Sequence, residues 1–383
     1  MRSFVFTIIA VCTFCILFPS CDGEGNRAEI SQGDTLTVRY ASHLQMVECG
    51  GYTLVNLRNP WDTLRTLHTY ILMPRDKEYD ADTLPKGTVV RVPLQRSVIY
   101  TSVHCGLVNE WGALDGVAGV CDVKYIHQEE VLQRLADGRM MDLGNAQSPD
   151  VERMIDLQPD ALLLSPFENS GGYGRVDHMG VPIIECADYM ETSALGRAEW
   201  MRFYGRLYGC GDKADSLFDV VEKEYMAWKQ KTQACVGHPT VFADLPVGSS
   251  AWYVSGGGST IGRMYADAGA RYLFADNTST GSVPLSFETV YAKAQHADIW
   301  LIRYHAVQDR TYRSLAAEFE PYTHFDAFRN RRMYGCNTAH SRFYDEIPFH
   351  PERLLAEFAC MFHPELCTDK QDAFHYYAPL ELE

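Results

Sequence analysis

One segment in the middle of the chain constrains the fold more than any other. Residues 212–233, DKADSLFDVVEKEYMAWKQKTQ, contain no Gly or Pro that would interrupt a helix. A helix of this length spans about 33 Å, the dimension of a small domain. We therefore predict one long helix that is the sole covalent link between two lobes and holds them as a stiff pair around a cleft. Apolar residues recur along it at helical spacing, at positions 214, 217, 218, 221, 225 and 228.

The chain on either side of this helix alternates between short apolar runs and segments with helical spacing. The runs include SVIYTS, ALLLSP and VPIIEC before the helix, and PTVFADL and DIWLIRY after it. Continuous apolar strands separated by helices are typical of a parallel sheet that is covered on both faces. The predicted fold class is therefore α/β, with mainly parallel sheets in two lobes, residues 95–211 and 238–367, and a tail at 368–383.

Residues 34–94 have a different pattern from the lobes. The segments LTVRYA, YTLVNLR, TYILMP and TVVRVPL alternate as strands do and are separated by Gly, Asn-Pro and Pro-Lys-Gly. This pattern predicts a small β-meander ahead of the main fold, as an N-terminal β extension.

The N-terminus indicates export. A single Arg precedes a fifteen-residue, largely apolar run, Phe4–Phe18, which as a helix would span only about 23 Å and is too short for a membrane span. Cys21 follows directly, as in a bacterial lipoprotein signal, so we predict a signal peptide at 1–20, lipidation of Cys21 and a polar tether at 21–33. Phe18 departs from the preferred Leu of such signals, and the alternative is a plain signal peptide with an incidental Cys.

Composition excludes several function classes. Apolar content of 46% and charged content of 22% are those of a globular protein. The formal net charge of −16 argues against a nucleic-acid partner or a polybasic membrane patch, because both need concentrated Lys and Arg.

Three of the twelve cysteines belong to the predicted signal and its lipidation site. None of the other nine has C-x-x-C spacing, and no His-rich loop or His/Asp/Glu cluster occurs, so no metal site is predicted. Cys105, Cys121 and Cys186 lie in or beside apolar runs, which favours buried free thiols. Cys360 and Cys367 are close enough in sequence to pair locally, but the sequence gives no reason to prefer that pairing.

One phrase of the sequence occurs twice, once in each predicted lobe. In DVERMIDLQPDALLLSP and in FETVYAKAQHADIWLI, a glutamate at the start of a helical segment lies nine positions before the alanine that opens an apolar strand. These glutamates are Glu152 and Glu288. The simple explanation is the preference of acidic residues for the first turn of a helix.

Taken together, several phrases resemble the helix-bridged (class III) periplasmic substrate-binding proteins of ABC importers, which deliver ferric siderophores, haem and cobalamin. The resemblance covers residues 95–367 and leaves 34–94 outside. It implies a monomer without a cofactor or enzymatic activity that binds a small iron chelate or tetrapyrrole and partners an ABC permease dimer. The phrases are SVIYTSVHCGLVNEWGALDGVAGVCDVKYI, DVERMIDLQPDALLLSP, GVPIIEC, the bridging helix, FETVYAKAQHADIWLI and HPERLLAEFACMFHPEL.

The resemblance also gives the repeated glutamates a role. In this family each lobe carries a surface glutamate that docks onto arginines of one permease subunit, and Glu152 and Glu288 match those positions. Two carboxylates on one rigid body suit a two-fold partner with arginine donors.

Ligands of α/β lobes bind beyond the carboxyl ends of the strands. The predicted strand ends contain many aromatic residues and a few polar side chains, a combination that suits a large planar or aromatic ligand. An anionic chelate could pair with Arg342. Packing in the core or at the rim is the alternative for each aromatic residue. The candidate ligand-binding residues are His104, Tyr125, Phe167, Trp252, Tyr253, Arg342 and Tyr344.

Two of these candidates have further interpretations. His104 follows a strand and begins a helix, where an imidazole could contact a ligand or its iron, but a cap or a structural hydrogen bond is the commoner role. Tyr125 could ligate haem iron, as tyrosines do in some members of the family.

The glycine-rich loops SGGYG and SGGGST lack the Lys-Ser/Thr ending of a nucleotide-binding loop, and no HExxH motif occurs. The sequence therefore favours a lipid-anchored solute-binding protein in the periplasm. The alternatives are an exported enzyme that acts on the chelate and a surface lipoprotein that partners an outer-membrane receptor. The sequence does not decide between cell membrane and outer membrane, nor among haem, cobalamin and ferric siderophores.

Overall fold

The computed structural model of the 383-residue chain describes residues 34–168, 172–247, 251–367 and 374–383. The predicted signal peptide, the tether and Cys21 lie outside the described residues. Among the residues described, no helix is both long enough and apolar enough to cross a membrane.

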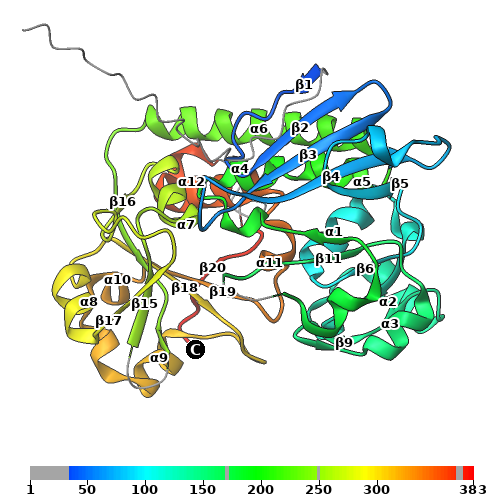
Figure 1. The fold of residues 1–383 in the computed structure, drawn as a ribbon. Coiled ribbons are helices and arrows are strands. Elements are labelled where there is room, and N and C mark those ends of the chain that lie inside the picture. The colour runs from blue at the N-terminus through cyan, green and yellow to red at the C-terminus, as the bar shows by residue number, and fades with distance from the viewer. Residues whose placement is uncertain (1–33, 169–171, 248–250, 368–373) are drawn as a thin grey trace, which may run out of the picture.

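The long helix is present as α6, Gly211–Gln233, and runs along one side of the molecule over both lobes (Figure 1). Its apolar stripe is buried through Ala214, Phe218, Val221 and Tyr225, as the periodicity predicts. The two parallel sheets of the lobes are formed by strands before and after α6 respectively, so the chain passes from one sheet to the other through this helix. The predicted fold class is confirmed.

The N-terminal lobe contains a five-stranded, fully parallel sheet. Its strand order is β12 (Ile183–Glu185), β11 (Leu162–Leu164), β6 (Ser97–Ile99), β7 (Val117–Val120) and β8 (Met141–Asp142). The crossovers contain α1 (Ser102–Glu110), α2 (Glu129–Ala136) and α3 (Val151–Leu157), and a short ribbon of β9 (Gly144–Asn145) and β10 (Ser148–Pro149). Two further helices, α4 (Ala194–Glu199) and α5 (Met201–Leu207), lead into α6.

The C-terminal lobe contains a second five-stranded sheet, parallel except for its last strand. Its order is β16 (Arg271–Tyr272), β13 (Thr240–Ala243), β18 (Ile299–Tyr304), β19 (Met333–Asn337) and β20 (Ala378–Pro379). Beside it, β14 (Pro246–Val247), β15 (Ala251–Ser255) and β17 (Ser282–Leu285) form a small antiparallel sheet. The helices are α7 (Thr260–Asp267), α8 (Phe287–Ala294), α9 (Tyr312–Glu318), α10 (Asp326–Arg329), α11 (Phe343–Glu346) and α12 (Pro351–Phe362).

An aromatic cluster fills the core of this lobe. Phe242 on β13 stacks on Trp300 of β18 with ring centroids 4.9 Å apart, and Phe325 stacks on Phe242 at 5.3 Å. Trp252 of β15 packs against Trp300 at 5.7 Å. Rings at these separations add about 0.5–1.5 kcal/mol per pair to the stabilisation from burial, so the cluster rigidly joins the two sheets of the lobe.

Residues 34–92 form the predicted β extension. Strands β1 (Asp34–Leu36), β2 (Leu44–Cys49), β3 (Tyr52–Arg58) and β4 (Thr66–Pro74) pair antiparallel in chain order. The fifth strand, β5 (Thr88–Val92), pairs with β4 in parallel, so the sheet is a meander with one parallel strand added. It lies beside α5 and α6 on the N-terminal lobe (Figure 1).

Two buried carboxylates fasten the extension to the body. Glu199, at the end of α4, accepts hydrogen bonds from the backbone N–H groups of residues 39–41 at 2.7–3.0 Å. Glu191 accepts the N–H groups of residues 42 and 43 at 2.9 Å and the indole N–H of Trp200 at 3.0 Å. Because both carboxylates are buried, these N–H groups replace the hydrogen bonds that water would donate to them.

The cysteines differ in one respect from expectation. Cys105, Cys121 and Cys186 are buried and free, as predicted. Cys360 and Cys367 form a disulfide that the sequence did not favour. The reason is local, because α12 ends at Phe362 and the turn that follows brings the Cα atoms of the two cysteines to 5.6 Å.

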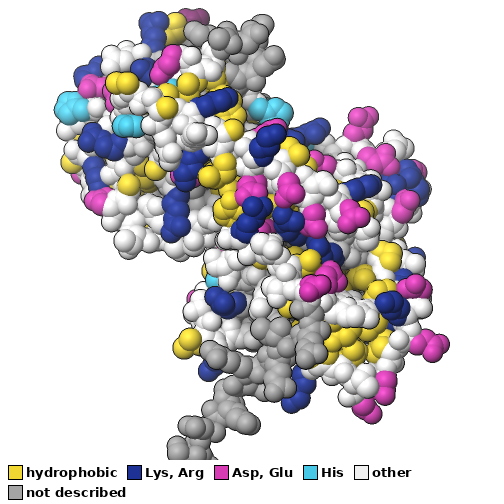
Figure 2. All heavy atoms as spheres, turned by 90° about the horizontal axis from the view of Figure 1, so that it is seen from above, with side chains coloured by type: hydrophobic (Ala, Val, Ile, Leu, Met, Phe, Trp, Pro, Cys, Tyr) yellow, Lys and Arg dark blue, Asp and Glu magenta, His cyan; other side chains and the backbone are white. Residues whose placement is uncertain are grey.

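Seen from above, Lys and Arg side chains lie beside Asp and Glu side chains over the middle of the molecule (Figure 2). Around the first half of α6, Arg202 pairs with Asp215 at 2.8 Å and with Asp219 at 2.9 Å, and Arg206 pairs with Asp215 at 3.1 Å. On this face the charges are mixed and no basic patch forms, in keeping with the composition.

We predict that Glu199→Ala destabilises the protein and loosens the extension. The substitution leaves several buried N–H groups without an acceptor, and we expect the free energy of unfolding to fall by about 2–5 kcal/mol. Urea denaturation measures the loss, and hydrogen exchange should show faster exchange in residues 34–58. Glu224→Ala, on the exposed face of α6, is the control and should change stability by less than about 0.5 kcal/mol. Equal urea midpoints for both variants would contradict the assignment.

Candidate ligand-binding site

A cavity of about 880 Å³ lies between the two lobes. Its lining residues follow the carboxyl ends of β6, β7 and β11 in the N-terminal lobe and of β13, β18 and β19 in the C-terminal lobe. Both parallel sheets therefore direct the same end of their strands, where α/β proteins bind ligands, toward one space. The short helix α11 lies between the lobes (Figure 1) and contributes Tyr344 and Asp345 to the cavity lining.

The cavity wall is rich in aromatic side chains. Four of the large ones remain half exposed: Tyr125 is 50%, Phe167 60%, Tyr253 45% and Tyr344 58% accessible. Two of these lie on each lobe, so a flat ligand that entered between them would cover apolar surface from both sides. The aromatic lining residues are Tyr100, Tyr125, Phe167, Tyr173, Tyr253, Tyr304 and Tyr344.

The C-terminal wall contains a paired guanidinium. Arg303 on β18 binds both carboxylate oxygens of Asp244, with two N–O distances of 3.1 Å, and lies over the ring of Phe343 at 5.5 Å. Burial opposes the charge of Arg303, but the Asp244 carboxylate holds the pKa of the guanidinium well above its usual range. The arginine therefore stays charged with its partner, and its charge is largely compensated before any ligand arrives.

One hydrogen bond crosses between the lobes at the cavity. Nδ1 of His127, in the segment between β7 and α2, lies 3.1 Å from Oδ2 of Asp345 on α11. In the same wall, the ammonium of Lys124 lies 4.7 Å from the ring centre of Tyr125. The cavity lining contains two cations, three carboxylates and two histidines: Lys124, Arg303, Asp122, Asp244, Asp345, His127 and His305.

The backbone adopts the left-handed conformation at two cavity aspartates. Asp122 follows β7 with φ of 52°, and Asp244 follows β13 with φ of 68°. Asp is one of the few residues with a side chain that tolerates this conformation. Each sheet thus turns sharply at the cavity and presents a carboxylate there.

The structure brings four of the seven predicted ligand-binding residues into the cavity lining, namely Tyr125, Phe167, Tyr253 and Tyr344. The other three lie elsewhere. Trp252 is fully buried in the aromatic core, because successive residues of strand β15 point to opposite faces and only Tyr253 faces the cavity. Arg342 is not among the lining residues; its guanidinium lies 3.9 Å from Glu346, and Arg303 supplies the arginine of the wall.

His104 is part of a buried network under the cavity. Its Nδ1 lies 2.5 Å from Oγ1 of Thr101, and its Nε2 lies 2.9 Å from Oδ1 of Asp188. Asp188 also accepts hydrogen bonds from Arg197 at 3.0 Å and Tyr204 at 2.8 Å. With both ring nitrogens occupied and 5% exposure, His104 has the structural hydrogen-bonding role that the sequence left open for it.

Three residues of the cavity wall, Arg303, Asp244 and His127, are not among the candidates predicted from the sequence. Signals for two of them were present: Arg303 is the one charged residue in the apolar strand IWLIRY, and Asp244 directly follows the strand TVFA. His127 depends on α11 approaching from the other lobe, and nothing local in the sequence shows that contact.

The two repeated glutamates are exposed in the first turns of α3 and α8. Hydrogen bonds with its own backbone N–H and with Ser286 lower the pKa of Glu288, so this carboxylate is ionised. Figure 1 places α3 and α8 on different lobes, at opposite ends of the molecule and on the side away from α6.

A protein-family model described as "Periplasmic binding protein" matches residues 98–339. The chain belongs to this family. The match spans both lobes and α6, and it begins after the β extension, as the resemblance in sequence indicated. Two uncharacterized lipoproteins of Methanocaldococcus jannaschii, MJ0878 and MJ0872, are each 24% identical to the chain. The first aligns over 77% of this chain and 71% of its own length, and the second over 78% and 77%.

Solved structures of periplasmic binding proteins share the fold. A possible iron-binding (periplasmic solute-binding) protein from Staphylococcus epidermidis has a TM-score of 0.55 at 14% identity and covers 71% of this chain and 99% of its own. A protein of an ABC-type Fe3+-hydroxamate transport system from Saccharomonospora viridis has a TM-score of 0.55 at 16% identity. The alignment covers 73% of this chain and 96% of that protein. A periplasmic heme-binding protein from Pseudomonas aeruginosa has a TM-score of 0.53 at 17% identity. The alignment covers 70% of this chain and 93% of that protein. In this periplasmic binding protein, the β extension lies ahead of the residues that the family model matches.

We predict that His104 makes stability depend on pH in the alkaline range. Burial alone would lower the pKa of His104. The neighbouring Cys186 and Asp188 raise the pKa by more than burial lowers it, and the result is about 10. An unfolded histidine titrates near 6.5, so the stabilisation is complete below that pH and is lost as the pH rises toward 10. Urea denaturation between pH 6 and 10 should show falling stability, with a smaller slope in His104→Gln.

His350 makes a second contribution of the same sign. Burial opposes its charge, but Glu110 and Glu352 raise the pKa of its ring to about 9. His350→Gln should therefore also reduce the slope, and the double variant should reduce it most. An unchanged slope in His104→Gln would show that its imidazole is neutral in the folded protein.

Proposed function

We propose that this chain is a lipid-anchored solute-binding protein of an ABC importer, which captures a ferric siderophore or a related iron chelate or tetrapyrrole such as haem or cobalamin. The observation that carries the proposal is the inter-lobe cavity, with half-exposed aromatic side chains on both walls, in a member of the periplasmic binding protein family. Structural relatives are named for binding iron, a ferric hydroxamate and heme.

The size and lining of the cavity favour a bulky ligand over a bare ion. A volume of about 880 Å³ lies in the upper part of the range of roughly 300–1,000 Å³ for small-molecule sites. A bare transition-metal ion would instead need a compact set of nitrogen, oxygen or sulfur ligands. The exposed tyrosine and phenylalanine rings offer apolar area for an organic chelator or macrocycle.

The charges of the wall favour a chelate of low net charge. Arg303 is already paired with Asp244, and Lys124 faces a cavity that also contains Asp122 and Asp345. A strongly anionic chelate would meet no free cluster of cations, and desolvating its charge would be costly. A neutral or weakly cationic iron complex fits this balance.

We propose that Glu152 and Glu288 dock the loaded protein onto the permease. They lie one on each lobe, exposed in helix first turns, on the side of the molecule away from α6 (Figure 1). A two-fold permease that presents one arginine per subunit could bind both carboxylates at once. The match to two proteins named as lipoproteins supports export and lipidation at Cys21, with the cell membrane as the site of attachment.

The ligand assignment is tested by fluorescence titration of the purified chain with haem, cobalamin, ferric siderophores of different charge and their iron-free forms. We expect saturable quenching by one compound, because Trp300 donates to the backbone of the cavity residue Asp244. Tyr125→Ala and Tyr253→Ala, one on each wall, should each weaken binding about tenfold, since losing a stacked aromatic contact costs about 1.5 kcal/mol.

The control is Tyr79→Ala, which removes an exposed ring of the β extension outside the cavity and should leave affinity unchanged. Mass spectrometry of the released ligand should return it unmodified. A modified ligand would instead support the alternative of an exported enzyme. No binding by any compound would leave the alternative of a surface lipoprotein that partners an outer-membrane receptor.

The docking proposal is tested by ligand uptake in cells. Glu152→Lys with Glu288→Lys should abolish uptake, because the reversed charges repel the arginines of the permease, while ligand affinity of the purified variant stays the same. The matched control reverses two other exposed glutamates, Glu78 and Glu224, and should retain uptake. Normal uptake by the first double variant would refute docking by this pair.

A further inference from the structure

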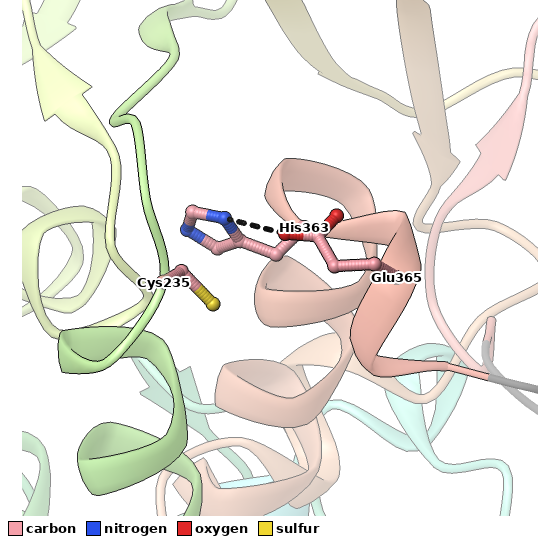
Figure 3. Close-up of side chains that lie close together, drawn as sticks. All are labelled: Cys235, His363 and Glu365. Atoms are coloured by element: carbon pink, nitrogen blue, oxygen red, sulfur yellow. Dashed lines mark ion pairs between the residues drawn. The ribbon is translucent and has the colours of Figure 1, made fainter.

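A second group of metal-ligating side chains lies outside the cavity lining. Cys235 follows the end of α6, and His363 and Glu365 follow the end of α12 (Figure 3). A sulfur, a ring nitrogen and a carboxylate oxygen from these three residues all lie within 4.8 Å of one another. Over the described ranges of the chain, no other trio of His, Cys, Asp or Glu side chains is grouped in this way.

The orientation of His363 leaves one ring nitrogen with a free lone pair. Its Nε2 lies 3.3 Å from the backbone carbonyl of Gly269, and a carbonyl only accepts, so Nε2 carries the hydrogen. Nδ1 faces Oε1 of Glu365 at 3.7 Å, and in the neutral ring it is the nitrogen with the free lone pair (Figure 3). Nδ1 of this histidine, which is 2% exposed, and the carboxylate can share a cation: a proton on the ring, or a metal ion that the nearby sulfur of Cys235 also binds.

The position of the imidazole is fixed by its surroundings. Gly269 has φ of +81°, and a Cβ atom added there would lie 2.4 Å from Nε2 of His363, so the ring occupies space that only glycine leaves. The same carbonyl also accepts from Nδ1 of His238 at 2.8 Å. A carbonyl behind the far nitrogen is the usual outer partner of a metal-binding histidine, because it orients the ring and fixes the tautomer.

The chain around the ligands is also constrained. The disulfide between Cys360 and Cys367 closes a short loop that contains both His363 and Glu365, which limits how far their backbone can move. Cys235 follows the end of α6. The last turn of α6 is held beside α7 by Thr232, which donates a hydrogen bond to the carbonyl of Asp267 at 2.6 Å. The three ligands thus come from two helix ends held next to each other.

The donor set identifies the ion. One thiolate, one imidazole and one carboxylate match the ligand types of Zn²⁺, which takes four ligands in a tetrahedral arrangement and would keep one position for water. Binding would release the thiol proton, because only the thiolate coordinates. We propose that Cys235, His363 and Glu365 form a Zn²⁺ site that fastens the C-terminal end of α6 to the end of α12.

The test uses the purified full chain, stripped of metal by a chelator and kept without reductant so that the disulfide persists. Calorimetric titration with Zn²⁺ should show one equivalent bound, and Zn²⁺ should raise the melting temperature. Co²⁺ should give a thiolate-to-metal charge-transfer band. Cys235→Ser should remove that band, and both Cys235→Ser and Glu365→Gln should weaken Zn²⁺ binding by more than the roughly 10–100-fold caused by losing an outer partner.

Two controls separate this site from other sources of binding. Cys210→Ser removes another partly buried thiol and should leave Zn²⁺ affinity and the cobalt band unchanged. His127→Ala removes an imidazole of the inter-lobe cavity and should do the same. Cys235 and Glu365 are not fully buried, so both variants should unfold like the parent when zinc is absent. No Zn²⁺ binding, or binding that depends on His127 and not on Cys235, would overturn the proposal.

Discussion

Three buried carboxylates within twelve residues hold the parts of this molecule together. Asp188, Glu191 and Glu199 are each at most 3% exposed, and every one of their carboxylate oxygens accepts a hydrogen bond. Their donors come from α1, α4, α5 and the β extension, and the carbonyl of Glu191 also accepts from Thr260 of the C-terminal lobe at 3.2 Å. Because an unpaired buried charge costs several kcal/mol, the extension, the N-terminal lobe and the start of α7 have to keep their relative positions.

This arrangement explains why the cavity can be specific while its wall stays open. The three buried carboxylates and α6 fix the backbone of both lobes. The strand ends that carry the aromatic side chains of the cavity therefore keep their positions, although these rings do not pack on each other. In the function proposed above, recognition of the ligand depends on a few aromatic rings and on the Arg303–Asp244 pair. A ligand that fills the space gains from burial of apolar area and needs little ordering of the protein.

The sequence predicts what depends on local patterns. The length of α6 follows from the absence of Gly and Pro, and the position of Tyr125 or Phe167 follows from the rule that ligands meet parallel strands at their carboxyl ends. The prediction that Trp252 contacts the ligand fails, because neighbouring side chains of strand β15 point to opposite faces and only Tyr253 reaches the cavity. The contact between His127 and Asp345 depends on how the two lobes meet. The two residues are 218 positions apart in the sequence, and no local pattern predicts that they are close.

Asp122 follows strand β7 of the N-terminal lobe, Asp244 follows strand β13 of the C-terminal lobe, and both adopt the left-handed conformation. A residue with a Cβ atom is disfavoured there by roughly 1 kcal/mol. Glycine in place of Asp122 would therefore remove this cost, whereas glycine in place of Asp244 would leave the guanidinium of Arg303 without its carboxylate partner and would destabilise the protein. The charge at the cavity can therefore change by substitution at the turn after β7, whereas at the turn after β13 the pairing with Arg303 keeps the carboxylate in place.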